Sequence, residues 1–233
     1  MLERTDLDFL EQQQSMFTRI AGQYDLMNHI MSGWRDDIWR RYAIKQVALP
    51  ASGLLLDVGT GTGNLALEAS QLVPSSQIIA ADLTLPMMEI GRTSNPEADL
   101  DWASVDVSRL PFPSDTFDGV VSGFLARNLS DVFQGLSEQY RVLKSGGKIA
   151  ILETSKRAKD ILTPLIRLYM YHLIPSLSGL FTKNKEAYTY LYESTESFLR
   201  AEKLAALLAA AGFQKVFFKR FMFGLIAVHW GEK

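Results

Sequence analysis

The sequence contains no cysteine and only three histidines, His29, His172 and His229, among its 233 residues. The absence of cysteine excludes disulfide-stabilised folds, thiolate metal sites and cysteine nucleophiles, and three scattered histidines give no metal-binding cluster. Neither sign of charge is in large excess, because 24 Lys and Arg stand against 26 Asp and Glu. A broad nucleic-acid interface needs clustered basic residues. We therefore expect no metal cofactor and no nucleic-acid partner.

Long uninterrupted hydrophobic runs are also lacking. Residues 1–6 are polar and acidic, without the apolar run of a signal peptide behind them. The most membrane-like stretch, residues 161–181, contains Arg167, His172 and two prolines, and a charge near the centre of a bilayer is costly. We therefore expect a cytoplasmic protein rather than one that spans a membrane.

Composition and hydrophobic patterning predict one globular α/β domain. Hydrophobic residues make up 47% and charged residues 21% of the chain, as in ordinary soluble domains. Short apolar segments alternate with amphipathic ones, which is typical of a doubly wound, mostly parallel sheet. The chain 1–233 is thus predicted to form a single domain with four parts: an N-terminal helical cover (8–48), a cofactor-binding core (53–155), a helical insertion (156–198), and a C-terminal helix with two antiparallel strands (199–233).

A glycine-rich loop follows the first predicted strand of this core. The buried strand Leu54–Val58 runs into residues 59–63, which read GTGTG. Glycines at this place let backbone N–H groups approach a ligand closely from a helix N-terminus, although they also suit a simple tight turn. Asp82 ends the next predicted strand, where an acid accepts hydrogen bonds from both hydroxyls of a ribose. The two features together predict a cofactor that contains a nucleoside.

The spacing of the glycines separates two kinds of nucleoside cofactor. A dinucleotide site reads G-x-G-x-x-G, and the position of its third glycine is Asn64 here. The G-x-G-x-G form preceded by Asp57 resembles the motif of S-adenosylmethionine-dependent methyltransferases. In such a site, Asp57 is expected to bind the cofactor's ammonium and the loop amides its carboxylate. The alternative is that Asp57 is a structural acid that is hydrogen-bonded within the loop. Asp106 is placed to accept from the adenine amino group beside the Val107 amide, or caps a turn.

Several stretches resemble the ubiquinone/menaquinone biosynthesis C-methyltransferase family, over residues 16–230. They are residues 16–28 (MFTRIAGQYDLMN), 109–113 (RLPFP), 127–128 (RN), 140–144 (YRVLK), 186–191 (EAYTYL) and 224–229 (GLIAVH). The resemblance implies a seven-stranded Rossmann-like sheet, parallel except for one reversed strand near the C-terminus. It also implies methylation of a ring carbon on a polyprenylated hydroquinone, with S-adenosylmethionine as the donor.

The same resemblance places Thr62, Asp82, Asp106 and Val107 at cofactor-contacting positions. Gly123 stands where the family has a serine, although Ser122 adjoins it, and Phe124-Leu125-Ala126 replaces the usual Phe-Gly-Leu. The full set predicted to bind the cofactor is Asp57, Gly59, Thr60, Gly61, Thr62, Gly63, Asp82, Leu83, Asp106, Val107, Ser122 and Gly123.

Arg127, Asn128 and Tyr24 are the predicted catalytic residues. A phenol titrates near pH ~10, and a fixed cation beside its hydroxyl lowers that value and makes the ring carbon nucleophilic. Arg127 suits this role as an electrostatic stabiliser, since arginine does not readily give up a proton; the alternative is a structural ion pair with Asp131. Tyr24 is predicted to cover the methionine end of the cofactor, and the alternative is an aromatic core residue. For His29, the two alternatives are a catalytic base and a histidine on a helix surface.

The tyrosine-rich insertion is predicted to cover an apolar aromatic acceptor. It could also dock transiently on a membrane surface, and a homodimer is left open. Because the sequence departs from the family pattern around the acceptor, transfer to oxygen, nitrogen or carbon of another small acceptor is an alternative. A nicotinamide-dependent oxidoreductase and a non-catalytic scaffold are the alternatives from other classes.

Overall fold

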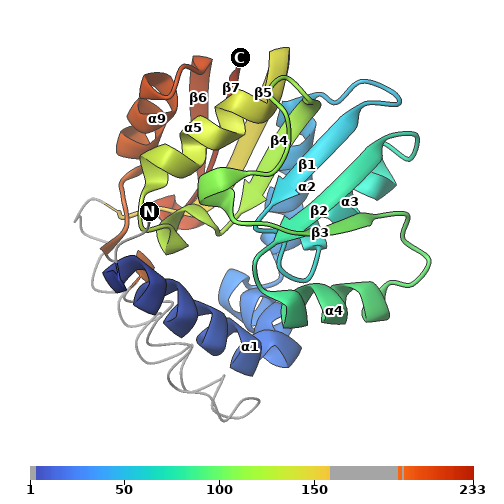
Figure 1. The fold of residues 1–233 in the computed structure, drawn as a ribbon. Helices are drawn as coiled ribbons and strands as arrows, with labels where there is room; N and C mark the ends of the chain where they lie inside the picture. Colours follow the sequence, from blue (N-terminus) through green and yellow to red (C-terminus); the bar gives the residue numbers. More distant parts are fainter. Residues whose placement is uncertain (1–3, 158–193, 196) are drawn as a thin grey trace.

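Seven strands form one mixed sheet in the order β3-β2-β1-β4-β5-β7-β6 (Figure 1). The computed structural model describes residues 4–157, 194–195 and 197–233. The strands are β1 (Leu54–Val58), β2 (Gln77–Asp82), β3 (Asp101–Ser104), β4 (Phe117–Gly123), β5 (Leu143–Thr154), β6 (Gln214–Phe221) and β7 (Ile226–Glu232). β1 to β5 are parallel, and β7 runs antiparallel to both β5 and β6. This confirms the mostly parallel sheet with one reversed strand near the C-terminus.

Helices cover both faces of the sheet. They are α1 (Arg4–Ser32), α2 (Asp36–Val47), α3 (Asn64–Leu72), α4 (Leu85–Ser94), α5 (Val132–Val142) and α9 (Ala201–Ala210), with short 3-10 turns η1 (Val107–Arg109), η2 (Ala126–Asn128) and η4 (Met222–Gly224). α2 and α3 share a hydrophobic cluster with one face, and α5 and α9 share a second cluster with the other. α1 lies beside α4 at the lower end of the sheet in Figure 1.

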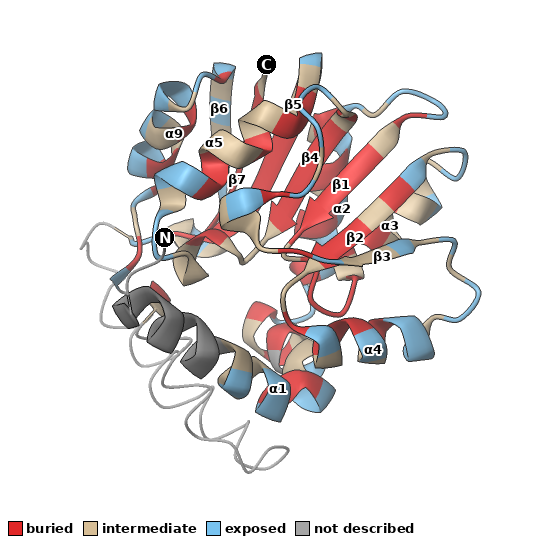
Figure 2. Ribbon diagram, in the orientation of Figure 1, coloured by how far each residue is buried: buried red, intermediate tan, exposed pale blue. Residues whose placement is uncertain are grey.

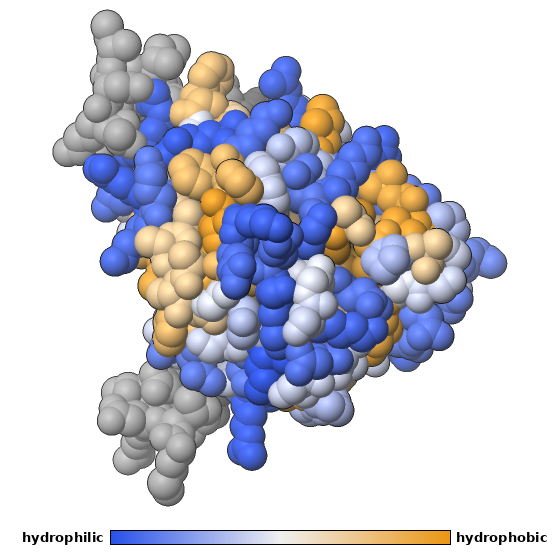
Figure 3. All heavy atoms as spheres, turned by 90° about the horizontal axis from the view of Figure 1, so that it is seen from above, coloured by the Kyte–Doolittle hydropathy of each residue, from blue (hydrophilic) through white to orange (hydrophobic). Residues whose placement is uncertain are grey.

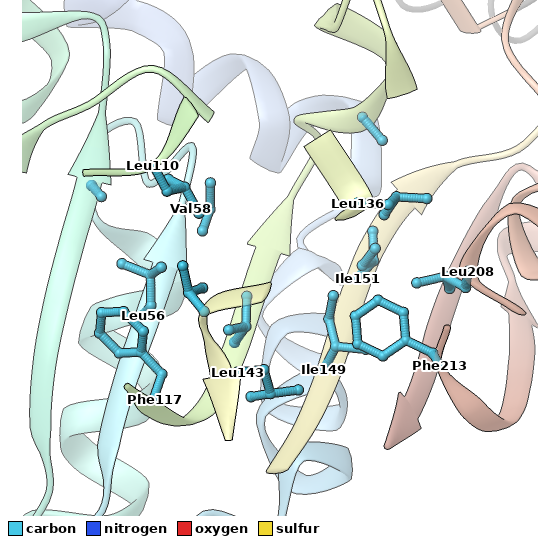
Figure 4. Close-up of a cluster of buried hydrophobic side chains, with 14 of the residues drawn as sticks. Leu56, Val58, Leu110, Phe117, Leu136, Leu143, Ile149, Ile151, Leu208 and Phe213 are labelled. Atoms are coloured by element: carbon cyan, nitrogen blue, oxygen red, sulfur yellow. The ribbon is translucent and has the colours of Figure 1, made fainter. Parts of the chain in front are cut away.

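The strands are hydrophobic on both sides because both faces are covered. In β1, Leu55 belongs to the cluster under α2 and α3, whereas Leu56 and Val58 belong to the cluster under α5 and α9. Figure 2 shows the buried residues concentrated in the central strands, and Figure 4 shows Leu56 and Phe117 among the side chains of the second cluster. The core therefore fixes the strand ends that carry polar residues.

The strand order reverses between β1 and β4. β1 pairs with β2 on one side and with β4 on the other, in the register Leu56↔Ile79 and Leu56↔Val120. In open α/β sheets, ligands bind at the carboxyl ends of the strands at such a point. The glycine-rich loop and the loop after β4 both start there, so the fold brings together two segments that the sequence separates by about sixty residues.

One predicted boundary is wrong. The two glycines in residues 144–147 (KSGG) predict the end of the preceding helix, but these residues lie within β5, which begins at Leu143. Leu143 pairs with Phe117, and the register shifts before Gly119 pairs with Lys148. The shift is possible because Gly146 adopts φ +79°, a conformation that costs glycine little. Its N–H donates to the Lys233 carbonyl at 2.7 Å, which ties the irregular start of β5 to the C-terminus.

Most of the insertion 156–198, with its predicted role as a cover, lies outside the described residues. Among the helices that the structure does describe, none combines the length and the apolar character needed to cross a membrane. The face in Figure 3 carries hydrophobic side chains in several groups separated by hydrophilic ones. The N-terminal segment predicted to be helical forms two helices, with α1 ending at Ser32 and Gly33 and Trp34 forming the turn at φ +60° and +58°.

Candidate cofactor and acceptor site

Three cavities meet around Phe124, which lines all of them. The largest has a volume of about 350 Å³ and runs past Asp82 and Asp106. A cavity of about 60 Å³ is lined by Arg127 together with residues of α1 and α2. A cavity of about 40 Å³ lies against Asp57 and the glycine-rich loop. The strand ends at the β1–β4 reversal thus border one large space and two smaller ones.

The glycine-rich loop is a tight turn held by its own backbone. The N–H groups of Gly59 and Thr60 donate to the Ala81 carbonyl at 2.8 and 3.0 Å, and that of Gly63 donates to the Thr60 carbonyl at 2.9 Å. The Gly61 N–H donates to Asp82 Oδ2 at 2.8 Å. Four of the five loop N–H groups therefore already donate within the protein, and the predicted contact of loop amides with a carboxylate stays a prediction.

Steric fit explains why two of these positions are glycine. Gly59 and Gly63 adopt φ +69° and +87°, where side chains are strained. A Cβ on Gly59 would lie 2.7 Å from Leu125 Cδ1, and one on Gly63 would lie 2.6 Å from the Trp102 ring. The glycines let the loop after β4 and the β3 tryptophan pack directly against the turn, so packing alone requires glycine at both positions.

Asp57 is a buried acid with one unsatisfied oxygen. Its Oδ2 accepts from Thr60 Oγ1 at 2.6 Å and from the Ala66 N–H at 3.1 Å, which fits the predicted structural role. Its Oδ1 is buried without a hydrogen-bond partner among the described residues. Burial raises the pKa of Asp57 to about 7, against the lowering effect of the bonds from Thr60 and Ala66. An ammonium group in the 40 Å³ cavity would satisfy this oxygen, so both predicted roles of Asp57 fit the geometry.

Asp82 lies at the rim of the 350 Å³ cavity. Its two oxygens each accept one backbone N–H, from Gly61 at 2.8 Å and from Thr84 at 2.7 Å. Burial raises its pKa, and these two bonds lower it. A carboxylate offers about four acceptor positions, so capacity remains for the hydroxyls of a ribose. Leu83 lines the same cavity.

Asp106 and Val107 lie further along the same cavity. Asp106 Oδ1 accepts from the Ser108 N–H at 2.8 Å and from its hydroxyl at 2.7 Å. Asp106 therefore caps η1, the alternative predicted for it. Both bonds use Oδ1, so they leave Oδ2 of this cavity-lining residue available as an acceptor. The residue can cap the turn and still accept from an adenine amino group.

Two of the predicted cofactor residues lie away from the cavities, and one further residue was missed. Ser122 is buried within β4 and Gly63 packs on Trp102, and neither lines a described cavity, whereas Gly123 lines two. In the sequence, Asp25 stands out only as part of the segment 16–28. Its Oδ1 accepts from Thr62 Oγ1 at 2.8 Å and from Asn64 Nδ2 at 2.6 Å. Its position next to Tyr24 was the signal that could have identified it.

Arg127 makes a buried ion pair, but not with Asp131. Its Nη1 donates to Glu153 Oε1 at 2.6 Å and its backbone N–H donates to Oε2 at 3.2 Å. The two side chains are 2% and 0% exposed. Asp131 instead caps α5 through the Gln134 N–H at 3.0 Å. The predicted partner is wrong because the pairing of β4 with β5 brings Glu153 next to Arg127, although the two residues are 26 positions apart in the sequence.

Asn128 and Tyr24 border the cofactor side of the site. Asn128 lines the 350 Å³ cavity, and its Nδ2 donates to the Phe124 carbonyl at 3.0 Å. Tyr24 lines both the 350 and the 40 Å³ cavities. Burial raises the pKa of the Tyr24 hydroxyl, and this effect is opposed by the charge of Arg127 and by the neighbouring Asn28 side chain. Tyr24 thus lies between these two cavities, and its contact with the methionine end of a cofactor stays a prediction.

His29 is engaged in a polar cluster at the junction of α1 and α2. Its Nδ1 lies 2.9 Å from Asp36 Oδ1. The carboxylates of Asp36 and Asp37 lie near enough to His29 for a metal site, but Arg40 Nη1 bonds both at 2.6 and 3.0 Å. The guanidinium takes the place a cation would occupy. His29 itself lines none of the three cavities.

Comparison with known proteins gives matches over nearly the whole chain. The model of the ubiE/COQ5 methyltransferase family matches residues 8–233. The chain is 40% identical over 220 residues to a ubiquinone/menaquinone biosynthesis C-methyltransferase UbiE of Desulfotalea psychrophila, covering 94% of this chain and 89% of that protein. It is 38% identical over 220 residues to a demethylmenaquinone methyltransferase of Thermus thermophilus, covering 94% and 100%.

Solved structures extend the match at the level of the fold. A Thermotoga maritima protein described as an S-adenosylmethionine-dependent methyltransferase and possible histamine N-methyltransferase superposes with a TM-score of 0.67. It is 21% identical, with 94% of this chain and 98% of that chain covered. Identity this low carries the fold and not the substrate.

Proposed function

Because the chain belongs to the ubiE/COQ5 methyltransferase family, we propose that it transfers the methyl group of S-adenosylmethionine to a ring carbon of a prenylated quinol in menaquinone or ubiquinone biosynthesis. The chain is a methyltransferase, and the two relatives described above carry names from that biosynthesis. A quinol acceptor suits the cavity beside Arg127, whose surface is mostly apolar with polar and charged side chains such as Asp36 and Arg127 among its lining.

The assignment of the donor rests on one observation above all, the unsatisfied Oδ1 of Asp57. A buried carboxylate oxygen without a partner is costly, and the ammonium of the cofactor's methionine would remove this cost. Asp82 and Asp106 then supply acceptors for the ribose and the adenine along the 350 Å³ cavity. The acidic lining also suits S-adenosylmethionine better than a dinucleotide, whose pyrophosphate it would repel.

The bound cofactor supplies an electrophilic methyl group, so the residues mainly align and activate the acceptor. Alignment of reacting atoms within roughly 3–3.5 Å supplies much of the rate. Arg127 presents a fixed positive charge to the acceptor cavity, where it stabilises the phenolate that makes the ring carbon nucleophilic. Glu153 holds the guanidinium and its backbone in place. Phe124 and Trp39 form an apolar wall that excludes water from the ring.

A single incubation tests this proposal. Protein, methyl-labelled S-adenosylmethionine and a panel of demethylated benzoquinols and naphthoquinols are combined under reducing conditions. We expect label on a ring carbon of at least one quinol, located by mass spectrometry of the product. Label on an oxygen, or transfer to none of the quinols by a protein that binds the donor, would contradict it. The insertion 156–198 is proposed to cover the acceptor and to give a peripheral membrane contact on the cytoplasmic side.

A further inference from the structure

The 60 Å³ cavity is lined by one member from each of two buried ion pairs. Arg127 comes from the pair with Glu153, and Asp36 comes from the pair with Arg40, each with a distance of 2.6 Å. A cation and an anion therefore border the same small space. The remaining lining residues are Asn28, Met31, Ser32, Trp39, Phe124, Thr154, Thr195, Met222, Leu225 and Ile226. Mostly apolar surroundings make both charges effective at short range.

Asp36 has one acceptor position left. Its Oδ1 accepts from Ser32 Oγ at 2.7 Å and lies 2.9 Å from His29 Nδ1, and its Oδ2 accepts from Arg40 Nη1. A carboxylate has about four such positions, so these three contacts leave one, on Oδ2. Burial alone would raise the pKa of Asp36, but the charge of Arg40 and the bonds from Ser32 and His29 outweigh it and lower the pKa.

An ionised carboxylate in this position accepts hydrogen bonds and donates none. A ring hydroxyl of a hydroquinone can donate to it. The matching carbonyl oxygen of the oxidised quinone cannot, and it would face a negative charge. The other charged residue of the lining, Arg127, favours a negatively charged or carbonyl oxygen and does not separate the two redox forms in the same way. The Asp36 carboxylate thus distinguishes the hydroquinone from the quinone, because it can accept a hydrogen bond but cannot donate one.

We propose that Asp36 is a specificity-determining residue that selects the reduced, hydroquinone form of the acceptor by accepting a hydrogen bond from a ring hydroxyl. This inference rests on the proposed function, because it requires an aromatic diol as the acceptor. Only the reduced ring carries a carbon that is nucleophilic enough to be methylated, so the selection keeps the oxidised form from occupying the site. At 60 Å³ the cavity takes the hydroxyl-bearing edge of the ring.

Anaerobic calorimetry tests the inference in the presence of S-adenosylhomocysteine, which prevents turnover. The probes are a 1,4-naphthoquinone with one short prenyl chain, its reduced form, and the two mono-methyl ethers of the reduced form. We expect the wild type to bind the reduced form at least ~10-fold more tightly than the quinone, the effect of a hydrogen bond to a charged group. One of the two ethers should lose about the same factor, because its capped oxygen no longer donates.

Two variants complete the design. In Asp36→Asn the amide can donate to a carbonyl, so the preference for the reduced form should fall to within about 3-fold. Asp37→Asn is the matched control, since Asp37 also contacts Arg40 but is 65% exposed and does not line the cavity; it should keep the wild-type preference. Equal binding of both redox forms by the wild type, or an unchanged preference in Asp36→Asn, would overturn the inference.

The ether series needs no substitution, so the test remains decisive if Asp36→Asn does not fold. Failure of the proposed function gives a different result. In that case none of the four probes binds, or the reduced form binds without ever being methylated when S-adenosylmethionine replaces the product analogue. Methylation of the quinol by a protein that binds both redox forms equally would leave the proposed function intact and reject the role of Asp36.

Discussion

At the scale of single residues, the buried Asp57 carboxylate destabilises the cofactor-free protein but is the group that we expect to bind the cofactor. Its burial raises the pKa to about 7, so the folded protein binds a proton that the unfolded chain has lost above pH ~4. At acid pH, Asp57 therefore does not lower the free energy of unfolding. The free energy of unfolding decreases as the pH rises from ~4 to ~7, and the full decrease is reached above pH ~7. The same unsatisfied oxygen is the group that we assign to the cofactor's ammonium.

Asp57→Asn should therefore stabilise the free protein and weaken the binding of S-adenosylmethionine. At pH 8 we expect an increase of about 1–2 kcal/mol in the free energy of unfolding, part of the ~4 kcal/mol that the pKa shift represents. At pH 4 the increase should largely vanish. The dissociation constant for the cofactor should rise by about 10-fold or more. Thermal unfolding and calorimetry at the two pH values measure both effects.

The exposed Asp99→Asn is the control for a simple change of net charge, and it should leave stability and affinity near the wild-type values. The wild-type affinity should also fall as the pH drops below 7, because a protonated Asp57 no longer pairs with an ammonium. A variant Asp57→Asn that binds the cofactor normally would show that another group holds the ammonium.

Arg127 can be tested without leaving a buried charge unpaired. Removing one member of a buried ion pair typically costs about 3–5 kcal/mol, which would obscure any effect on the reaction. Arg127→Lys keeps the charge beside Glu153 but loses the planar, multiply bonded guanidinium. We expect the single-turnover rate to fall about 100-fold with the affinity for S-adenosylmethionine changed less than about 3-fold. Equal losses in rate and affinity would mean that Arg127 holds the cofactor instead.

At the scale of elements, α1 is attached to the glycine-rich loop through Asp25. The helix contacts α4, and Asp25 Oδ1 receives both Thr62 Oγ1 and Asn64 Nδ2. Gln14 adds a bond from its Nε2 to the Leu83 carbonyl at 3.2 Å. Gln14, Leu83, Thr62 and Asn64, which take part in these contacts, line the 350 and 40 Å³ cavities. These bonds therefore connect α1 to the glycine-rich loop and to the end of β2, beside the cavities that we assign to the cofactor.

Asp25→Ala should loosen α1 with little change elsewhere. Hydrogen exchange of the α1 amides should become faster by about 10-fold, which corresponds to the loss of one or two hydrogen bonds. The exchange of β1 and β4 amides should stay unchanged. Mass spectrometry of exchanged peptides measures this, with the exposed Gln23→Ala on the same helix as the control. Uniformly faster exchange throughout the sheet would indicate a role of Asp25 in the whole fold.

The elements that could be predicted from the sequence are those with a local signal. The strand Leu54–Val58 is a short apolar run, and the glycines and Asp82 mark where two strands end, so the sheet edge and the donor site follow from local pattern. The start of β5 does not, because residues 144–147 form a strand only through pairing with β4 and the C-terminus. The contacts Arg127–Glu153 and Asp25–Thr62 join segments far apart in the chain. No spacing rule predicts such pairs.

At the scale of the whole molecule, stability against pH is the sum of buried groups that act in opposite directions. Asp57 favours the folded state as the pH falls below 7, whereas His229 disfavours it. His229 is fully buried in β7, with Nε2 donating to the Ala201 carbonyl of α9 at 2.9 Å and Nδ1 without a partner among the described residues. Burial lowers the pKa of His229 to about 4. The overall profile should therefore be flatter than either residue alone would give.

His229→Gln separates the two contributions. The unfolded chain takes up a proton on His229 near pH ~6.5 and the folded protein only near pH 4, so stability is retained above 6.5 and lost as the pH falls to 4. The shift amounts to about 3 kcal/mol. Glutamine can keep the bond to Ala201 and does not titrate. Urea unfolding from pH 8 to 4 should show the wild type losing about 3 kcal/mol relative to His229→Gln. A constant difference between the two proteins across this range would mean that His229 does not titrate with folding.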